Sequence, residues 1–127
     1  MSARPPPETG PAGSFLNDLA VDDERGFVYI ADVGGTGEPA LVTVDINKAS
    51  SRRFSASPAL NAENLDLVVE GRVIGAKGDD GKPKPARIAV NPITLSADGE
   101  TLYFAEVNMK ALPRLLVVDL KTLDWSL

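Results

Sequence analysis

The side chains able to do chemistry in this chain are of few kinds. Its 127 residues include no histidine and no cysteine. Their absence excludes a Ser-His-Asp triad, a cysteine nucleophile, a thiolate or HExxH zinc site and a disulfide framework. Carboxylates, asparagine, lysine and tyrosine remain as groups for catalysis or ligand binding. Many enzyme classes are thereby excluded, and it stays open whether the chain is an enzyme.

Three short motifs resemble ligand loops in composition only. Gly34-Gly-Thr-Gly37 lacks the Gly-Lys-Ser/Thr ending of a phosphate loop and precedes no helical pattern. We interpret it as a hairpin loop. Asp22-Asp23-Glu24 and Asp79-Asp80 lack the twelve-residue calcium loop with its terminal Glu, and we interpret them as solvated turns.

Net charge weighs against two classes of partner. The formal net charge is -5 at pH 7, and no basic cluster is larger than the pair Arg52-Arg53. An acidic chain repels a phosphate backbone and an anionic lipid surface. No stretch approaches the ~20 apolar residues of a membrane span, and the start of the chain lacks the apolar core of a signal peptide. We therefore expect no nucleic-acid partner and no membrane partner.

The elements that must position any site are organised as an internal repeat. Slid against itself by 74 residues, the chain matches without a gap, which is typical of repeat architectures. The identical pairs are Asn17/Asn91, Tyr29/Tyr103, Ala31/Ala105, Val33/Val107, Pro39/Pro113, Leu41/Leu115, Val44/Val118 and Asp45/Asp119. The similar pairs are Leu19/Ile93, Val21/Leu95, Val28/Leu102, Asp32/Glu106 and Ile46/Leu120.

Each copy reads as short strands joined by tight turns at Arg25-Gly26 and Asp98-Gly99. Strands are predicted at 19–22, 27–32, 41–46 and 51–54, and again at 93–96, 101–106, 115–120 and 124–126. Three or four antiparallel strands form one blade of a β-propeller. The equivalent residues Tyr29 and Tyr103 are predicted to pack between blades. Trp125 is expected either to close a blade or to lie exposed.

The sequence therefore predicts an all-β chain, a β-propeller fragment of about two four-stranded antiparallel blades with an inserted hairpin. The predicted order is an extended, loosely held N-terminal arm at 1–13, a blade at 14–60, the insertion at 61–89 and a second blade at 90–127. The insertion is expected to turn at Glu70-Gly71 and to continue into a solvated loop at 78–85.

Four phrases carry a resemblance to a known family. They are Phe15-Leu-Asn-Asp-Leu-Ala-Val-Asp22, Gly26-Phe-Val-Tyr-Ile-Ala-Asp-Val-Gly34, Pro39-Ala-Leu-Val-Thr-Val-Asp45 and Asn91-Pro-Ile-Thr-Leu-Ser-Ala-Asp-Gly-Glu-Thr-Leu-Tyr103. In this order and spacing they resemble the bacterial branch of the yellow / major royal jelly protein family, over residues 14 to about 108. The first and last phrases are also similar to motifs of the gluconolactonase / senescence-marker-protein family of six-bladed propellers.

The second resemblance implies a site. In the gluconolactonase-like family the Asn of the last phrase ligates a divalent metal and the Asn of the first faces the substrate, and Asn91 and Asn17 occupy those positions. Asn17, Asp18 and Asn91 are thus candidate ligand or channel-lining residues. Asn91 and Asn17 are candidate ligands for a divalent cation, Ca²⁺ or Zn²⁺. The alternative is that each Asn caps a local turn. Pro92 departs from the family, which has Gly there.

Three functions stay open. The first is a small-ligand-binding or interaction module of the yellow / major royal jelly type, whose relatives are generally secreted or periplasmic. The second is a metal-dependent lactone hydrolase, for which the family's carboxylate ligands on other blades are missing here. The third is a non-functional truncated fragment. The compartment of this chain is not determined by its sequence.

Two blades alone would cover each other on one face only. The remaining apolar faces and strand edges favour self-association. Three copies joined head to tail would supply six blades and close a ring as a cyclic trimer. That ring would place three copies each of Asn17, Asp18 and Asn91 around one channel mouth.

Overall fold

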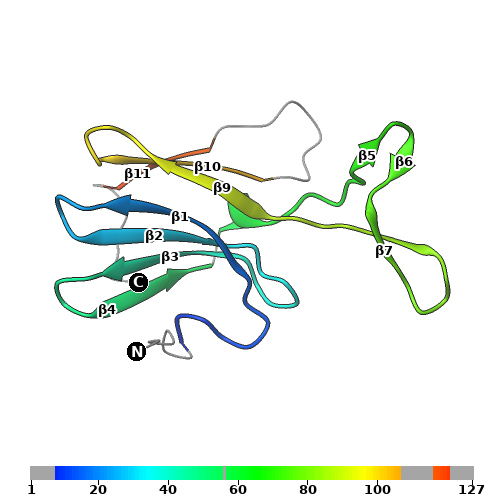
Figure 1. Ribbon diagram of the computed structural model, residues 1–127, viewed down its shortest axis with the longest axis horizontal. Coiled ribbons are helices and arrows are strands. Elements are labelled where there is room, and N and C mark those ends of the chain that lie inside the picture. The colour runs from blue at the N-terminus through cyan, green and yellow to red at the C-terminus, as the bar shows by residue number, and fades with distance from the viewer. Residues whose placement is uncertain (1–7, 56, 107–115, 121–127) are drawn as a thin grey trace.

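The computed structural model describes residues 8–55, 57–106 and 116–120, with the backbone alone at 106 and 116–119 (Figure 1). Its regular elements are strands apart from one 3₁₀ turn. They are β1 (Leu16–Asp22), β2 (Phe27–Asp32), β3 (Ala40–Asp45), β4 (Ser50–Phe54), η1 (Pro58–Leu60), β5 (Val68–Val69), β6 (Arg72–Val73), β7 (Gly75–Lys77), β8 (Pro83–Pro85), β9 (Val90–Leu95), β10 (Thr101–Glu106) and β11 (Leu116–Asp119). The all-β prediction is confirmed.

The first sheet is the predicted four-stranded antiparallel meander β1-β2-β3-β4. The turn between β1 and β2 closes at Gly26, whose φ of +73° a residue with a side chain rarely adopts. Its N–H donates to the carbonyl of Asp22 at 2.9 Å. The alternation of the strands then places Tyr29, Ala31 and Leu41 on one face of the sheet.

The second sheet repeats this order as β9, β10 and β11 within the described residues. Gly99, with φ +70°, lies in the equivalent turn, at the position that corresponds to Arg25 at the offset of 74. The predicted fourth strand at 124–126, with Trp125, lies outside the described residues. The repeat in the sequence is therefore a repeat of structure, and the arrangement is consistent with a β-propeller fragment.

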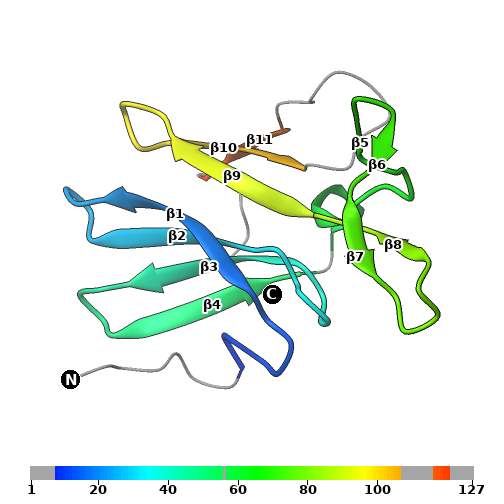
Figure 2. The ribbon, with the colours of Figure 1, turned by 45° about the vertical axis from the view of Figure 1, so that its right-hand side comes forward.

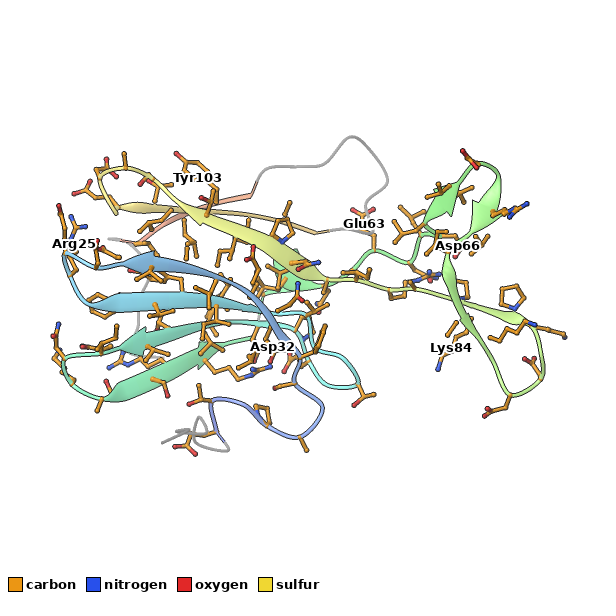
Figure 3. The ribbon with its side chains drawn as sticks, in the orientation of Figure 1. Arg25, Asp32, Glu63, Asp66, Lys84 and Tyr103 are labelled. Carbon is orange, nitrogen blue, oxygen red and sulfur yellow. The ribbon has the colours of Figure 1, made fainter. Side chains whose placement is uncertain are left out.

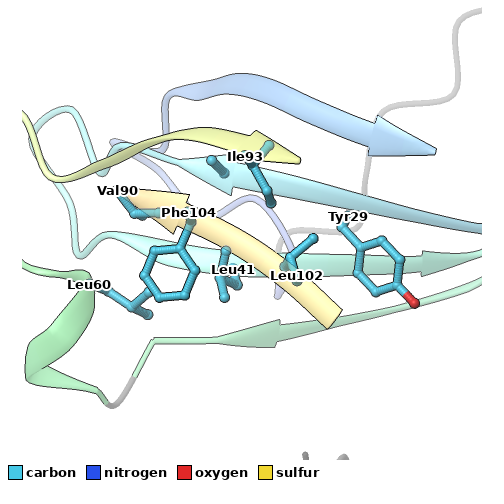
Figure 4. Close-up of a cluster of buried hydrophobic side chains, with 8 residues drawn as sticks. Tyr29, Leu41, Leu60, Val90, Ile93, Leu102 and Phe104 are labelled. Atoms are coloured by element: carbon cyan, nitrogen blue, oxygen red, sulfur yellow. The ribbon is translucent and has the colours of Figure 1, made fainter. Parts of the chain in front are cut away.

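The two sheets pack face to face, with β1 and β9 next to each other (Figures 1 and 2). Side chains from both sheets form one core, shown in Figure 4. Its buried members are Tyr29, Ala31, Leu41, Leu60, Val90, Ile93, Leu102 and Phe104. Each large apolar side chain removed from water stabilises the fold by about 1.5–3 kcal/mol. Leu60 is brought to this core by η1, which Ser57 caps by accepting from the N–H of Ala59.

The prediction for the two tyrosines holds for one of them. Tyr29 is buried in the core between the sheets. Tyr103 is half-buried and lies on the other side of its sheet, because its neighbours Leu102 and Phe104 both point into the core. The repeat places both tyrosines on the same face of their own sheets, and only the first of these faces is covered by the other sheet.

The inserted segment contains two hairpins that extend away from the sheets (Figures 1 and 2). The predicted hairpin at Glu70-Gly71 is confirmed: β5 pairs with β6, and both turn residues have positive φ, as a type I′ turn requires. The predicted loop at 78–85 is instead the turn and return strand of a second hairpin, β7-β8. Its turn is stabilised by the Asp80 side chain, which accepts from the N–H of Lys82 at 3.0 Å.

The N-terminal segment also differs from its prediction where the structure describes it. Thr9 is 1% exposed, and its hydroxyl is 2.6 Å from that of Ser51 on β4. The Thr9 carbonyl accepts from Nη1 of Arg53 at 3.2 Å. Residues 8–13 are therefore held against the outer face of the first sheet and are not a loose arm. On β4, the Ser51 hydroxyl binds the Thr9 side chain and the Arg53 guanidinium binds the Thr9 carbonyl.

The loop between β2 and β3 provides a first testable prediction. Gly34 is buried with φ +88°, and a Cβ there would lie 2.7 Å from the Gly37 carbonyl oxygen and 2.8 Å from the Pro39 nitrogen. Gly71 has a similar φ of +75° but open space around it. Both glycine-to-alanine changes incur the strain of positive φ, and only Gly34→Ala adds a backbone clash. We expect urea denaturation to show Gly34→Ala destabilised by about 1–3 kcal/mol more than Gly71→Ala. Equal losses would contradict this packing of the loop.

Candidate functional site

The candidate residues Asn17 and Asn91, 74 positions apart, lie side by side where β1 and β9 meet. The side-chain amide of Asn17 donates a hydrogen bond to the side-chain oxygen of Asn91. Asn17 is exposed and Asn91 is half-buried. The structure thus brings together the two residues that the repeat marks as equivalent, and each uses its side chain toward the other sheet and not to cap a turn of its own.

Both asparagines lie in irregularities of their strands. In the β1-β2 ladder Leu16 pairs with Asp32 and Asp18 with Ala31, so that Asn17 is an extra residue. The β9-β10 ladder has a shift at the equivalent place, between its pairs at Val90 and Ile93. A β-bulge redirects a side chain and is over-represented next to binding sites.

The bulge also explains the departure at Pro92. A proline within a strand removes one N–H from the ladder and is tolerated at bulges. Pro92 lies in the shifted part of the β9-β10 register, where no regular pair is formed. The proline inside a strand pattern is therefore the feature of the sequence that indicates this irregularity.

Asp18 is the third predicted residue, and it joins the two sheets. Its Oδ1 accepts from the N–H of Leu19 at 3.0 Å, and its Oδ2 accepts from the N–H of Ile93 on β9 at 3.0 Å. The carboxylate is half-buried. It therefore fixes β9 against β1 one residue away from Asn17, so that the two amides keep their relative position.

The donor set at this edge is two amide groups and one carboxylate. Ca²⁺ takes six to eight oxygen ligands, and both oxygens of Asp18 already accept backbone N–H groups. Within the described part of the chain, no group of three acidic side chains is arranged to hold a metal. The side chains of this edge thus offer a cation two amide oxygens and one carboxylate that already accepts two N–H groups, and they also offer hydrogen bonds to a small molecule.

A buried ion pair, whose residues are not among the predicted site residues, supports this edge. Asp32 is completely buried, and its Oδ2 is 2.6 Å from Nη1 of Arg53 (Figure 3). Its Oδ1 accepts from the N–H groups of Phe15 and Gly34, each at 2.8 Å. Arg53 donates further to the carbonyl of Glu38. Because Phe15 precedes β1 by one residue, the pair anchors the segment that leads into Asn17.

The environment of Asp32 has opposing effects on its pKa. Burial alone would raise the pKa of this carboxyl, but the Arg53 guanidinium and the N–H groups of Gly34 and Phe15 stabilise the charged form and lower the pKa below its ordinary value of 3.8.

One feature of the sequence indicates that Asp32 has a structural role. An acidic residue ends an apolar strand at equivalent positions of both repeats, Asp32 and Glu106.

A cavity of about 450 Å³ lies between the sheets, at the end of β2 away from Asp32. Phe27 and Tyr29, whose stacked rings have centroids 6.4 Å apart, line it with Arg25, Arg52 and Leu120. The sequence gives no motif for it, because its lining residues come from both repeats and from their turns.

The predicted turns at the two acidic runs are confirmed, with one difference. Asp22 is 6% exposed and forms an ion pair with Arg25 at 3.0 Å, so it is not solvated. The backbone N–H of Arg25 and then its guanidinium lower the pKa of Asp22, against the opposing effect of burial. Asp79 and Asp80 are exposed.

Comparison with known proteins adds no assignment. The sequence matches no family model and no curated protein. None of the described residues belongs to a helix long and apolar enough to span a membrane.

Proposed function

We propose that this chain is a small-ligand-binding or interaction module of the yellow / major royal jelly protein type. Its ligand is bound at the edge where β1 and β9 meet. The observation that carries the proposal is the contact between Asn17 and Asn91, which come from equivalent bulges of two repeats. The four phrases described in the sequence support the family assignment.

The groups at this edge define the chemistry of the ligand. Each Asn amide offers two N–H donors and one carbonyl acceptor, and Asp18 adds a negative charge between the strands. Such a set recognises a small polar molecule with an amine or several hydroxyl groups. Each oxygen of Asp18 accepts one backbone N–H and keeps a second acceptor site, so charge-assisted hydrogen bonding to Asp18 favours the amine.

Binding of two probe ligands tests the proposal. Isothermal titration calorimetry is carried out with tyramine, a small amine, and with glucono-δ-lactone, each with and without Ca²⁺ or Zn²⁺. We expect tyramine to bind and Asn17→Ala or Asn91→Ala to weaken it about three- to tenfold, because each change removes a hydrogen bond that contributes about 0.5–1.5 kcal/mol. Asn61→Ala, at an exposed position after η1, is the matched control and should leave the affinity unchanged.

Other outcomes have definite meanings. If neither probe binds, or if Asn61→Ala has the same effect as the two site variants, the proposed edge is not the ligand site. If the protein hydrolyses the lactone in the presence of metal, and Asn91→Ala abolishes this hydrolysis, the protein is a lactone hydrolase and not a binding module.

A further inference from the structure

Each sheet has one face in the core and one face that the other sheet does not cover. The outer face of the first sheet is covered in part by residues 8–13, which Ser51 and Arg53 hold on β4. On its β1–β2 part, Leu19 is 56% and Val21 is 52% exposed. Val28 and Ile30, their partners on β2, are only half-buried. Apolar side chains that gather on an exposed face mark an interaction surface. We call this set of four residues the leading face.

The leading face is a repeat of a face that is already packed. Its four residues correspond, at the offset of 74, to Ile93, Leu95, Leu102 and Phe104. In the second sheet Ile93, Leu102 and Phe104 belong to the core, and Leu95 packs against it. The second sheet thus packs on the first through apolar residues whose equivalents in the first sheet lie on the face that the second sheet does not cover.

The open side of the second sheet carries the complementary set. Thr94, Tyr103 and Ala105 correspond to Ala20, Tyr29 and Ala31, which lie on the covered face of the first sheet. Tyr103 lies on the side of β10 turned away from the first sheet (Figure 3). Pro92, Thr94, Tyr103 and Ala105 line a shallow hollow of about 120 Å³. We call these four residues the trailing face.

We propose that a second copy of this chain docks its leading face on the trailing face of the first, and so continues the sheet-to-sheet interface within each chain. Leu19, Val21, Val28 and Ile30 of one copy then contact Tyr103 and Ala105 of the next. The contact is head to tail, and such contacts close into a ring when their rotation permits. The inference goes beyond the proposed function and does not depend on it.

The in-chain interface also specifies one contact across the junction. Within the chain, the Asn17 and Asn91 side chains touch. Between copies, Asn91 of one copy comes beside Asn17 of the next, which continues the row of amides. The bond from the N–H of Ile93 to Asp18 is not repeated, because the residue equivalent to Asp18 is Pro92. The junction therefore relies on apolar packing and the asparagine contact.

Cross-linking between two single-cysteine variants tests this geometry, since the chain has no cysteine of its own. Asn17→Cys and Asn91→Cys chains are refolded together and treated with a short bismaleimide. We expect a cross-linked dimer in the mixture and none with either variant alone. The double variant in one chain should cross-link internally, which shows that the reagent spans this contact. No dimer in the mixture, or dimers with one variant alone, would overturn the head-to-tail arrangement.

Charge placed on the leading face gives an independent test. Leu19→Lys/Val21→Lys should reduce the mass measured by light scattering to that of one chain. Val68→Lys/Val69→Lys is the matched control, because these hairpin valines are each 57% exposed and belong to neither face. Circular dichroism should show both variants folded. If the hairpin variant dissociates and the leading-face variant does not, the partner binds the insertion instead.

Discussion

Arg53→Met is expected to lower the free energy of unfolding by roughly 3–5 kcal/mol, the cost of leaving a buried charge without its partner. Asp32 is fully buried, and the Arg53 guanidinium is the one cation that reaches it among the described residues. The loss would extend beyond the pair, since Arg53 also binds the carbonyls of Thr9 and Glu38. Denaturation in urea, followed by circular dichroism, measures the change.

Arg52→Met is the matched control for this prediction. Arg52 is the preceding residue of β4, is exposed and points to the opposite face. It should change stability by less than about 0.5 kcal/mol. The double variant Asp32→Asn/Arg53→Met should be more stable than Arg53→Met alone, because it removes the unpaired charge. A small loss for Arg53→Met, or no recovery in the double variant, would contradict the role of the ion pair.

The same pair makes stability depend on pH with a definite sign. The pKa of Asp32 is lowered in the folded state, so its ionised form stabilises the fold at every pH above the ordinary value of 3.8. As pH falls below that value toward the lowered pKa, this contribution is lost. The difference in stability between the wild type and Arg53→Met should therefore be full at pH 6–7 and shrink as the solution is acidified.

Phe104→Ala is the second large effect, with an expected loss of about 3–5 kcal/mol in the free energy of unfolding. Phe104 is 4% exposed and packs in the core between the two sheets, near Leu60 (Figure 4). Removing the ring leaves a cavity that the strands cannot fill without breaking their ladders. Urea denaturation again measures the loss.

Tyr103→Ala separates packing within the chain from packing between chains. Tyr103 neighbours Phe104 on β10 but lies on the trailing face. We expect this variant to lose less stability than Phe104→Ala in the separated chain and to weaken self-association. If the two substitutions destabilise the separated chain equally, Tyr103 contributes to the core of the single chain as Phe104 does, and the assignment of Tyr103 to the trailing face is wrong.

The strands were predictable because the sequence repeats its own pattern. Short apolar segments between turn residues predict β1 to β3, and the offset of 74 transfers the first two of these strands to β9 and β10. The turns at Gly26 and Gly99 follow from the need for positive φ. These are local or repeated signals, and a single sequence carries them.

Other features depend on tertiary contacts and could not be predicted in this way. The held N-terminal segment requires Arg53 and Ser51 on a strand some 40 residues later in the chain. The second hairpin depends on the Asp80 turn, whose composition alone looks like a loop. The two candidate asparagines were identified by resemblance, but their contact depends on the bulges and on Asp18. Tyr103 is a further example: the repeat predicts its position in the strand, but its burial depends on which face of the sheet another element covers.

The mass of the protein in solution tests most directly the claim that these two sheets are blades with complementary open faces. Size-exclusion chromatography with light scattering is sufficient, at two concentrations. We expect a single species of three times the 13.4 kDa chain mass, as a ring of six blades requires. A monodisperse species of one chain mass at both concentrations would contradict it.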